Sequence, residues 1–242
     1  MGGKHFSAKA ITDVITSRTG TDGEYWEPFL GGGAMASRIG NLFSVAHYSD
    51  YHEPLIRMWE AVYAGLTVFD DPLRFFPEKI TEEDYRYYKT APVTPATALI
   101  GFGAGFGGKY FGGFSGYDKR NGGTYYETAC RGIARKAPKI FNTTTTLAHC
   151  SYERITPKPG DTVYCDPPYM GVTGYSTGGF AHDAFWQWCR ELTAAGVNVY
   201  VSEYNAPDDF TCIWTKQVQS TLSSQDKSRV AVEKLFVCEL ET

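Results

Sequence analysis

The residues best suited to chemistry form the turn Asp166-Pro167-Pro168-Tyr169, which directly follows the apolar run of residues 162–165. Each proline fixes its φ angle and lacks an N–H group, so the turn is stiff and presents carbonyl oxygens. A carboxylate, a proline carbonyl and an aromatic ring therefore converge where a predicted strand ends, which is where ligands bind in α/β sheets. The alternative is a proline-rich surface turn after an edge strand.

This set of groups suits methyl transfer to the exocyclic amine of adenine. That nitrogen is a poor nucleophile because its lone pair is delocalised into the ring. Hydrogen bonds from the amine to the Asp166 carboxylate and the Pro167 carbonyl would push the nitrogen towards tetrahedral geometry and free the lone pair. The Tyr169 ring would stack on the base, a contact worth about 1–3 kcal/mol. Much of the acceleration would come from positioning, and a base in a duplex would first have to flip out.

A second candidate ligand site is rich in glycine. The pattern Gly31-x-Gly33-x-x-Ala36 lies between a predicted strand and a predicted helix, and Asp50 ends the next strand. Glycines allow a sharp turn and a close approach of the backbone to a ligand, and the carboxylate can accept hydrogen bonds from a ribose diol. The pattern is typical of both NAD and S-adenosylmethionine sites, and a plain turn is the alternative.

A further glycine run, residues 103–109, also fits the dinucleotide pattern and most of a phosphate-binding loop. Magnesium binding in such a loop needs a Ser or Thr after the lysine, but Tyr110 follows Lys109. The preceding residues 94–98 are typical of a helix start rather than a strand. We therefore do not expect an ATP-binding loop here.

The elements that must position these sites alternate between strands and helices, as in an α/β nucleotide-binding domain. The last two strands predict an antiparallel end to the sheet. Hydrophobic periodicity predicts helices over residues 7–19, 34–42, 54–63 and 181–195, and strands over residues 25–30, 45–48, 162–165, 197–201, 212–218 and 229–238.

The composition is that of a globular protein. The 242 residues are 43% hydrophobic and 21% charged, and no apolar run approaches the roughly 18 residues that a membrane helix needs. The six cysteines are widely spaced, with no His partner at ligand spacing, which argues against structural zinc. We expect reduced thiols, no metal, a cytoplasmic location, no membrane contact, and a monomer or weak dimer.

Residues 66–89, which are rich in proline and charge, and residues 101–123 depart from the α/β alternation and predict an inserted subdomain. Residues 101–123 hold ten glycines and six aromatic residues. Residues 101–140 carry a net charge of +5, whereas the rest of the chain carries −9. A basic segment on an acidic body is expected of a contact with a polyanion, and a solvated helix face is the alternative.

These motifs resemble the Dam-type family of DNA adenine N6-methyltransferases over nearly the whole chain, in the family's order. The resemblance implies a Rossmann-like α/β sheet of the S-adenosylmethionine-dependent methyltransferase kind, with an inserted, largely helical target-recognition subdomain. Residues 1–65 and 151–242 would form the catalytic domain, and residues 66–150 the insertion. The matching segments are Gly2-Gly3-Lys4, residues 27–34, Ser49-Asp50 with Leu55-Ile56, residues 163–169 with Tyr175 and Phe180, and Arg229 with Glu233-Lys234-Leu235.

The same resemblance implies roles for individual residues. The catalytic residues would be Asp166, Pro167, Pro168 and Tyr169. S-adenosylmethionine, which leaves as S-adenosylhomocysteine, would be held by Lys4, Glu27, Pro28, Phe29, Gly31, Gly33, Asp50 and Asp166. Nucleic acid would be contacted by Lys109, Tyr110, Lys119, Arg120 and Arg131, with Tyr110 or Phe111 as a candidate wedge in the base stack.

Two departures from the family pattern affect these expectations. Family members carry an aromatic cofactor contact four positions before the lysine, a position that would precede Met1 here. This contact is either missing or supplied by another residue, with His5 and Phe6 as candidates. The recognition segment matches the family weakly, so the family's usual GATC target is not assumed.

The expected function is methylation of the N6 amine of a flipped-out adenine in double-stranded DNA that contains a short target sequence. Asp166 favours adenine, because Ser before Pro-Pro-Tyr is commoner in cytosine N4 enzymes. The alternatives are the same fold acting on cytosine N4 or on RNA, and a catalytically silent DNA-binding decoy. Restriction protection, phage self-modification and regulatory marking all fit the sequence.

Overall fold

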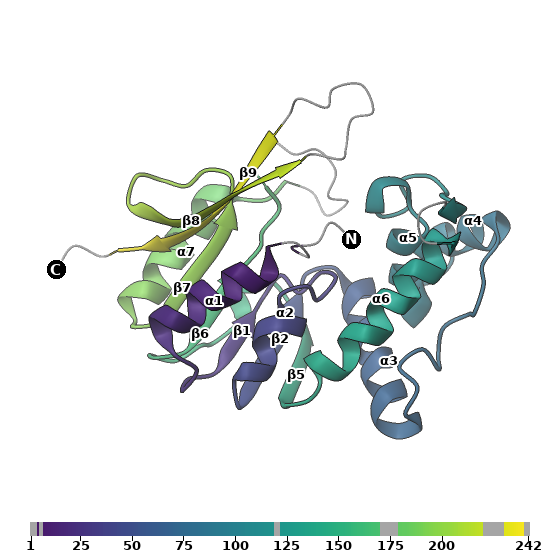
Figure 1. The fold of residues 1–242 in the computed structure, drawn as a ribbon, viewed down its shortest axis with the longest axis horizontal. Coiled ribbons are helices and arrows are strands. Elements are labelled where there is room, and N and C mark those ends of the chain that lie inside the picture. Colours follow the sequence, from purple (N-terminus) through teal and green to yellow (C-terminus); the bar gives the residue numbers. More distant parts are fainter. Residues whose placement is uncertain (1–3, 5–6, 119–121, 170–178, 220–229, 240–242) are drawn as a thin grey trace.

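The computed structural model describes residue 4 and residues 7–118, 122–169, 179–219 and 230–239. Within these residues, one sheet contains β1 (Tyr25–Glu27), β2 (Val45–Asp50), β5 (Thr144–His149), β6 (Thr162–Cys165), β7 (Asn198–Glu203), β8 (Phe210–Gln219) and β9 (Val230–Cys238). The strand order is β5-β2-β1-β6-β7-β9-β8 (Figure 1). The pairs from β5 to β7 are parallel, and β9 is antiparallel to both of its neighbours. The predicted Rossmann-like α/β fold with an antiparallel end is confirmed.

Two hydrophobic cores form on the sheet because successive strand residues point to opposite faces. In β6, Tyr164 joins the core that also holds α1 (Ala8–Thr19), α2 (Ala36–Ile39) and α3 (Glu53–Phe69). Its neighbours Val163 and Cys165 join the core formed with α7 (His182–Ala194). Short 3-10 helices, η2 (Gly40–Leu42) and η4 (Tyr152–Arg154), complete this part of the fold.

The middle of the chain is mostly helical. It contains α4 (Glu82–Thr90), α5 (Pro95–Gly103), η3 (Phe106–Gly108), the two-stranded sheet of β3 (Tyr117–Asp118) and β4 (Gly123–Thr124), and α6 (Tyr125–Ile140). The helices α4, α5 and α6 each begin with a capping box, at Thr81, Thr94 and Thr124. In a capping box, the side chains of the first and fourth residues bond each other's backbone N–H groups, which defines where the helix starts.

The expected end of the insertion at residue 150 does not coincide with the edge of the sheet. Strand β5 falls inside residues 66–150, yet it pairs with β2 over its whole length, from Thr144 opposite Val45 to His149 opposite Asp50. Residues 144–149 therefore belong to the main sheet. The sequence hides this strand because four consecutive threonines give no apolar run and the strand is largely exposed at the sheet edge. The division into two domains is otherwise still a prediction.

In the described part of the chain, no helix is long and apolar enough to span a bilayer. The six cysteines are unpaired, and four of them are buried. Among the same residues, no group of three or more His, Cys, Asp and Glu side chains is placed to hold a metal ion.

Candidate functional site

The two candidate ligand sites lie at the same edge of the sheet. Strand β1 pairs in parallel with β2 on one side and with β6 on the other, so the carboxyl ends of these three strands are neighbours. The glycine turn follows β1, Asp50 ends β2, and the Asp-Pro-Pro-Tyr turn follows β6. The topology therefore brings together the two turns that were expected to hold the cofactor and the acceptor.

The glycine turn has a backbone conformation that favours glycine. Gly31 and Gly33 have φ angles of 47° and 63°. The N–H group of Gly33 donates to the Leu30 carbonyl at 2.8 Å and closes the turn. A Cβ atom on Gly33 would lie 2.8 Å from side-chain atoms of both Ile140 and Trp59. Positive φ and close packing thus explain the glycines at these two positions.

Asp50 fixes the glycine turn relative to β2. One of its carboxylate oxygens accepts a hydrogen bond from the N–H group of Gly31 at 2.8 Å, and the other accepts one from the N–H group of His52 at 2.8 Å. Burial raises the pKa of Asp50, and the two hydrogen bonds oppose that rise. Each carboxylate oxygen can accept more than one hydrogen bond, so Asp50 can also bind a ribose hydroxyl.

Asp166 offers one carboxylate oxygen to two donors. Its Oδ1 lies 3.0 Å from Lys4 Nζ and accepts a hydrogen bond of 2.8 Å from the Tyr169 hydroxyl. Lys4 Nζ also lies 4.6 Å from the centroid of the Tyr169 ring, within cation–π distance. The structure therefore brings Lys4, Asp166 and Tyr169 together.

Carboxyl groups dominate the charge at this edge. Glu27 is buried and accepts a hydrogen bond of 2.9 Å from the Tyr25 hydroxyl. Burial raises the pKa of Glu27, and the charges of Asp166 and Asp50 raise it further. Burial also raises the pKa of Asp166, against the lowering effect of Lys4. Such a group of carboxylates, next to a turn that lets the backbone approach closely, fits a ligand with a positively charged sulfonium.

The remaining predicted cofactor and catalytic residues support the turns. Pro28 and Pro167 are buried, and Pro168 is half-buried. The Phe29 ring packs against Tyr152 and Phe180, with centroid distances of 5.6 and 5.9 Å. Phe29 therefore anchors the residues after β1 in the core beneath α7.

Sequence reasoning missed Tyr204, which follows β7. Its ring lies edge-on to the Tyr169 ring, with a centroid distance of 4.7 Å. Burial raises the pKa of Tyr204, and the charge of Lys4 lowers it. Tyr204 directly follows the carboxyl end of a buried strand that is parallel to β6. The same kind of position predicts Asp166 as a site residue.

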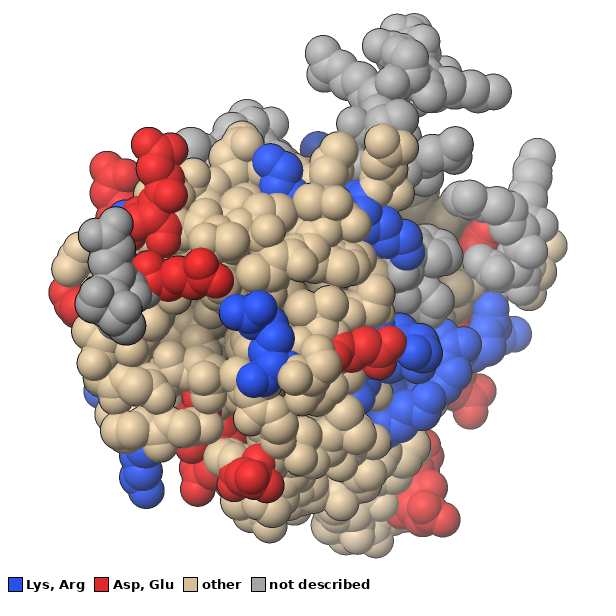
Figure 2. Space-filling model, turned by 60° about the vertical axis from the view of Figure 1, so that its left-hand side comes forward, with Lys and Arg blue, Asp and Glu red and all other residues tan. Residues whose placement is uncertain are grey.

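The basic residues expected to contact nucleic acid are only partly described. Lys109 and Arg131 are exposed. Figure 2 shows one face of the molecule, on which Lys and Arg side chains gather towards the centre and right. The expected residues that lie outside the described part of the chain are Gly2, Gly3, His5, Phe6, Lys119, Arg120, Tyr175 and Arg229.

The candidate wedge residues have different surroundings. Tyr110 is half-buried, and its ring centroid lies 4.5 Å from that of His52. Phe111 is only 8% exposed and packs on Tyr85, so its assignment as a wedge is wrong. The exposed aromatic side chains of residues 101–123 include Phe106 on η3, at 71% exposure, and Tyr117, at 66% exposure. The neighbours of Phe106 in the sequence are glycines, which offer no side chains for the ring to pack on, and this pattern could have predicted that the ring is exposed.

The solved structures that match this chain share little sequence with it. A conserved hypothetical protein from Streptococcus pyogenes is 12% identical, with a TM-score of 0.39 over 94% of this chain and 95% of that chain. An rRNA methylase from Streptococcus thermophilus is 8% identical, with a TM-score of 0.42 over 98% of each chain. A search of curated protein sequences gave no significant match.

The first part of the chain matches a family model. Residues 1–98 match the family model of D12 class N6 adenine-specific DNA methyltransferases. This span contains Lys4, the glycine turn and Asp50, and the match supports S-adenosylmethionine-dependent methyl transfer. Over residues 1–98, the predicted resemblance to N6 adenine-specific DNA methyltransferases is thus confirmed as similarity to the D12 class of these enzymes.

Proposed function

We propose that this protein is a DNA methyltransferase that methylates the N6 amine of an adenine flipped out of double-stranded DNA. The observation that carries the proposal is the position of Asp166. Its carboxylate is held by Lys4 and Tyr169 at the carboxyl end of β6, beside the glycine turn that follows β1. An acceptor at Asp166 would therefore lie next to a cofactor at that turn.

The cofactor side of the site would be formed by Gly31, Gly33 and Asp50, with Glu27 and Lys4 nearby. The positive φ angles of the two glycines let the backbone approach the ligand. Asp50 would accept hydrogen bonds from the ribose. When bound, S-adenosylmethionine supplies a methyl group on a sulfonium centre, a cation that suits the carboxylates of this edge.

The acceptor side would be formed by the Asp-Pro-Pro-Tyr turn. Lys4 and Tyr169 both contact Oδ1 of Asp166, so Oδ2 is the oxygen that we assign to the adenine amine. The Pro167 carbonyl would accept the second amine hydrogen, and the Tyr169 ring would stack on the base. An adenine paired in a duplex cannot reach these groups, which is why the proposal includes base flipping.

The DNA duplex would lie on the middle part of the chain. Residues 101–140 carry a net charge of +5, and Lys109 and Arg131 are exposed there. Phe106, which is also exposed, replaces Phe111 as the candidate wedge.

Incubation with isotope-labelled S-adenosylmethionine and mixed-sequence DNA, followed by nucleoside mass spectrometry, tests the proposal. We expect labelled 6-methyladenine with the wild-type protein and background levels with Asp166→Ala. Labelled 4-methylcytosine, or label that appears only in a parallel RNA incubation, would support the alternative acceptors. DNA binding with no labelled product would support the silent decoy. Sequencing the modified bases then gives the target sequence.

A further inference from the structure

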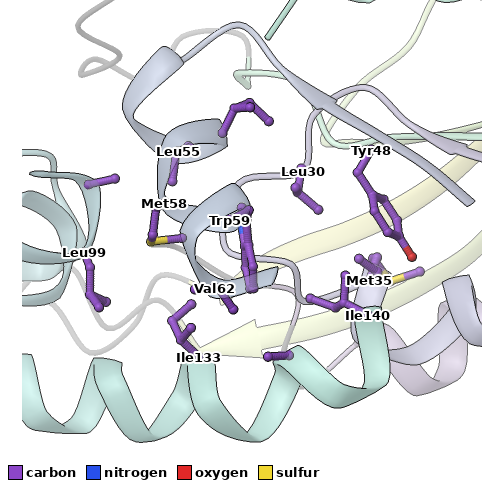
Figure 3. Close-up of a cluster of buried hydrophobic side chains, with 14 of the residues drawn as sticks. Leu30, Met35, Tyr48, Leu55, Met58, Trp59, Val62, Leu99, Ile133 and Ile140 are labelled. Carbon is purple, nitrogen blue, oxygen red and sulfur yellow. The ribbon is translucent and has the colours of Figure 1, made fainter. Parts of the chain in front are cut away.

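Side chains from two helices hold the carbonyl side of the glycine turn. Trp59 Nε1 of α3 donates a hydrogen bond to the Gly31 carbonyl at 3.0 Å. The ammonium of Lys136, on α6, donates to the Gly32 carbonyl. Figure 3 shows Trp59 and Ile140 in the cluster of buried side chains between these helices. The turn is therefore fixed by residues far from it in the sequence.

Lys136 is placed unlike a surface lysine. Its Nζ lies 5.8 Å from the centroid of the Trp59 ring. Burial lowers the pKa of Lys136 to about 8, with Arg135 acting in the same direction and Glu27 opposing it. A desolvated ammonium is costly unless acceptors compensate for the lost water. The Gly32 carbonyl and the Trp59 ring compensate for this loss, so they hold the Lys136 ammonium next to the glycine turn.

We propose that Lys136 is a positioning residue for the cofactor: by holding the Gly32 carbonyl, it keeps the turn of residues 31–33 in the conformation that receives S-adenosylmethionine. Glycine loses more conformational freedom on ordering than any other residue. A run of glycines that was free before binding would lose that freedom when the ligand arrived, which weakens affinity. The Lys136 contact orders the turn beforehand. This inference rests on the use of S-adenosylmethionine and is independent of the acceptor.

The test measures S-adenosylmethionine affinity by calorimetry without nucleic acid. Lys136→Met removes the ammonium and keeps an unbranched side chain beside Trp59. The matched control is Lys139→Met, because Lys139 is exposed on the same helix. We expect Lys136→Met to weaken cofactor binding about tenfold or more, as for a hydrogen bond to a charged group. Lys139→Met should bind like the wild type, and Lys136→Arg should restore part of the affinity.

A second control separates positioning from general damage to α6. Ile133 is buried in the same helix, and Ile133→Val should lower the thermal midpoint without changing cofactor affinity. In turnover assays, Lys136→Met should raise KM for S-adenosylmethionine far more than it lowers kcat at saturating cofactor. Equal affinity in Lys136→Met and Lys139→Met would overturn the proposal, as would equal losses in Lys136→Met and Ile133→Val. A wild-type protein that does not bind S-adenosylmethionine would contradict the methyltransferase function itself, whereas methylation of a different base would leave this inference intact.

Discussion

Lys4 Nζ lies 3.0 Å from Asp166 Oδ1, and the Lys4 side chain is only 5% exposed. The pair joins the beginning of the chain to the turn after β6. A buried ammonium is costly unless it is paired, and here the partner is the carboxylate that we assign to the acceptor. Lys4 therefore belongs to the acceptor site that we propose.

The most direct prediction concerns Asp166. Asp166→Ala removes the charged acceptor for the adenine amine, so kcat should fall by about 100-fold or more. The measurement is the rate of 6-methyladenine formation at saturating cofactor and DNA. Asp183→Ala, which changes an exposed aspartate on α7, is the control and should leave the rate near that of the wild type. A rate for Asp166→Ala close to that of the control would refute the role assigned to this carboxylate.

The Lys4 contact predicts a specific pH dependence. Asp166 must be ionised to accept hydrogen bonds from the amine, and burial raises its pKa while Lys4 lowers it. As the pH falls, activity should therefore be lost at a higher pH than it would be if Asp166 had the pKa of an ordinary aspartate. Lys4→Met removes the lowering effect, so the acid limb of kcat/KM should move to still higher pH. Lys9→Met, which alters a highly exposed lysine, is the control and should leave the acid limb where it is in the wild type. A shift of the acid limb to lower pH in Lys4→Met would contradict the role of Lys4 beside Asp166.

The glycine turn predicts different outcomes for two glycine substitutions. Gly33→Ala places a Cβ atom 2.8 Å from both Ile140 and Trp59 at a φ of 63°, so we expect a loss of about 1–3 kcal/mol in the free energy of unfolding. Cofactor affinity should fall as well. Gly132→Ala is the control, because nothing lies within 4 Å of its Cβ position on α6. There the better helix propensity of alanine should add up to about 1 kcal/mol. Denaturant unfolding measures the free energy of unfolding of both variants. Equal changes in Gly33→Ala and Gly132→Ala would show that the glycine turn is not constrained.

Local patterns in the sequence were sufficient for the centre of the site. The strand before Gly31, the strand before Asp166 and the acidic end of β2 each appear as short apolar runs followed by a turn. Parallel pairing of β1 with its two neighbours then places these residues at one edge without further information. The position of residues that follow strand ends is therefore predictable from the sequence.

Features that depend on tertiary packing were not predictable. Lys136 belongs to a basic stretch of an amphipathic helix, and only the folded structure shows that it contacts Gly32. Phe111 was expected at the surface, yet it is buried against Tyr85, because residues 105–114 form a compact loop against α5. Strand β5 was missed because threonine side chains at an exposed edge carry no hydrophobic pattern.

The exposed ring of Phe106 provides the last prediction. Its backbone N–H donates to the Gly113 carbonyl at 2.7 Å, so the loop is closed and carries the ring on its surface. A ring that stacks on or between bases contributes about 1–3 kcal/mol of binding free energy, so Phe106→Ala should weaken binding to a duplex by roughly that amount. The control is Phe69→Ala, an equally large side chain, 50% exposed at the end of α3. With 2-aminopurine at the target adenine, the fluorescence rise on binding should shrink in Phe106→Ala alone, because a base without a wedge leaves the stack less often. Equal affinity and equal fluorescence in the two variants would show that Phe106 is not the wedge.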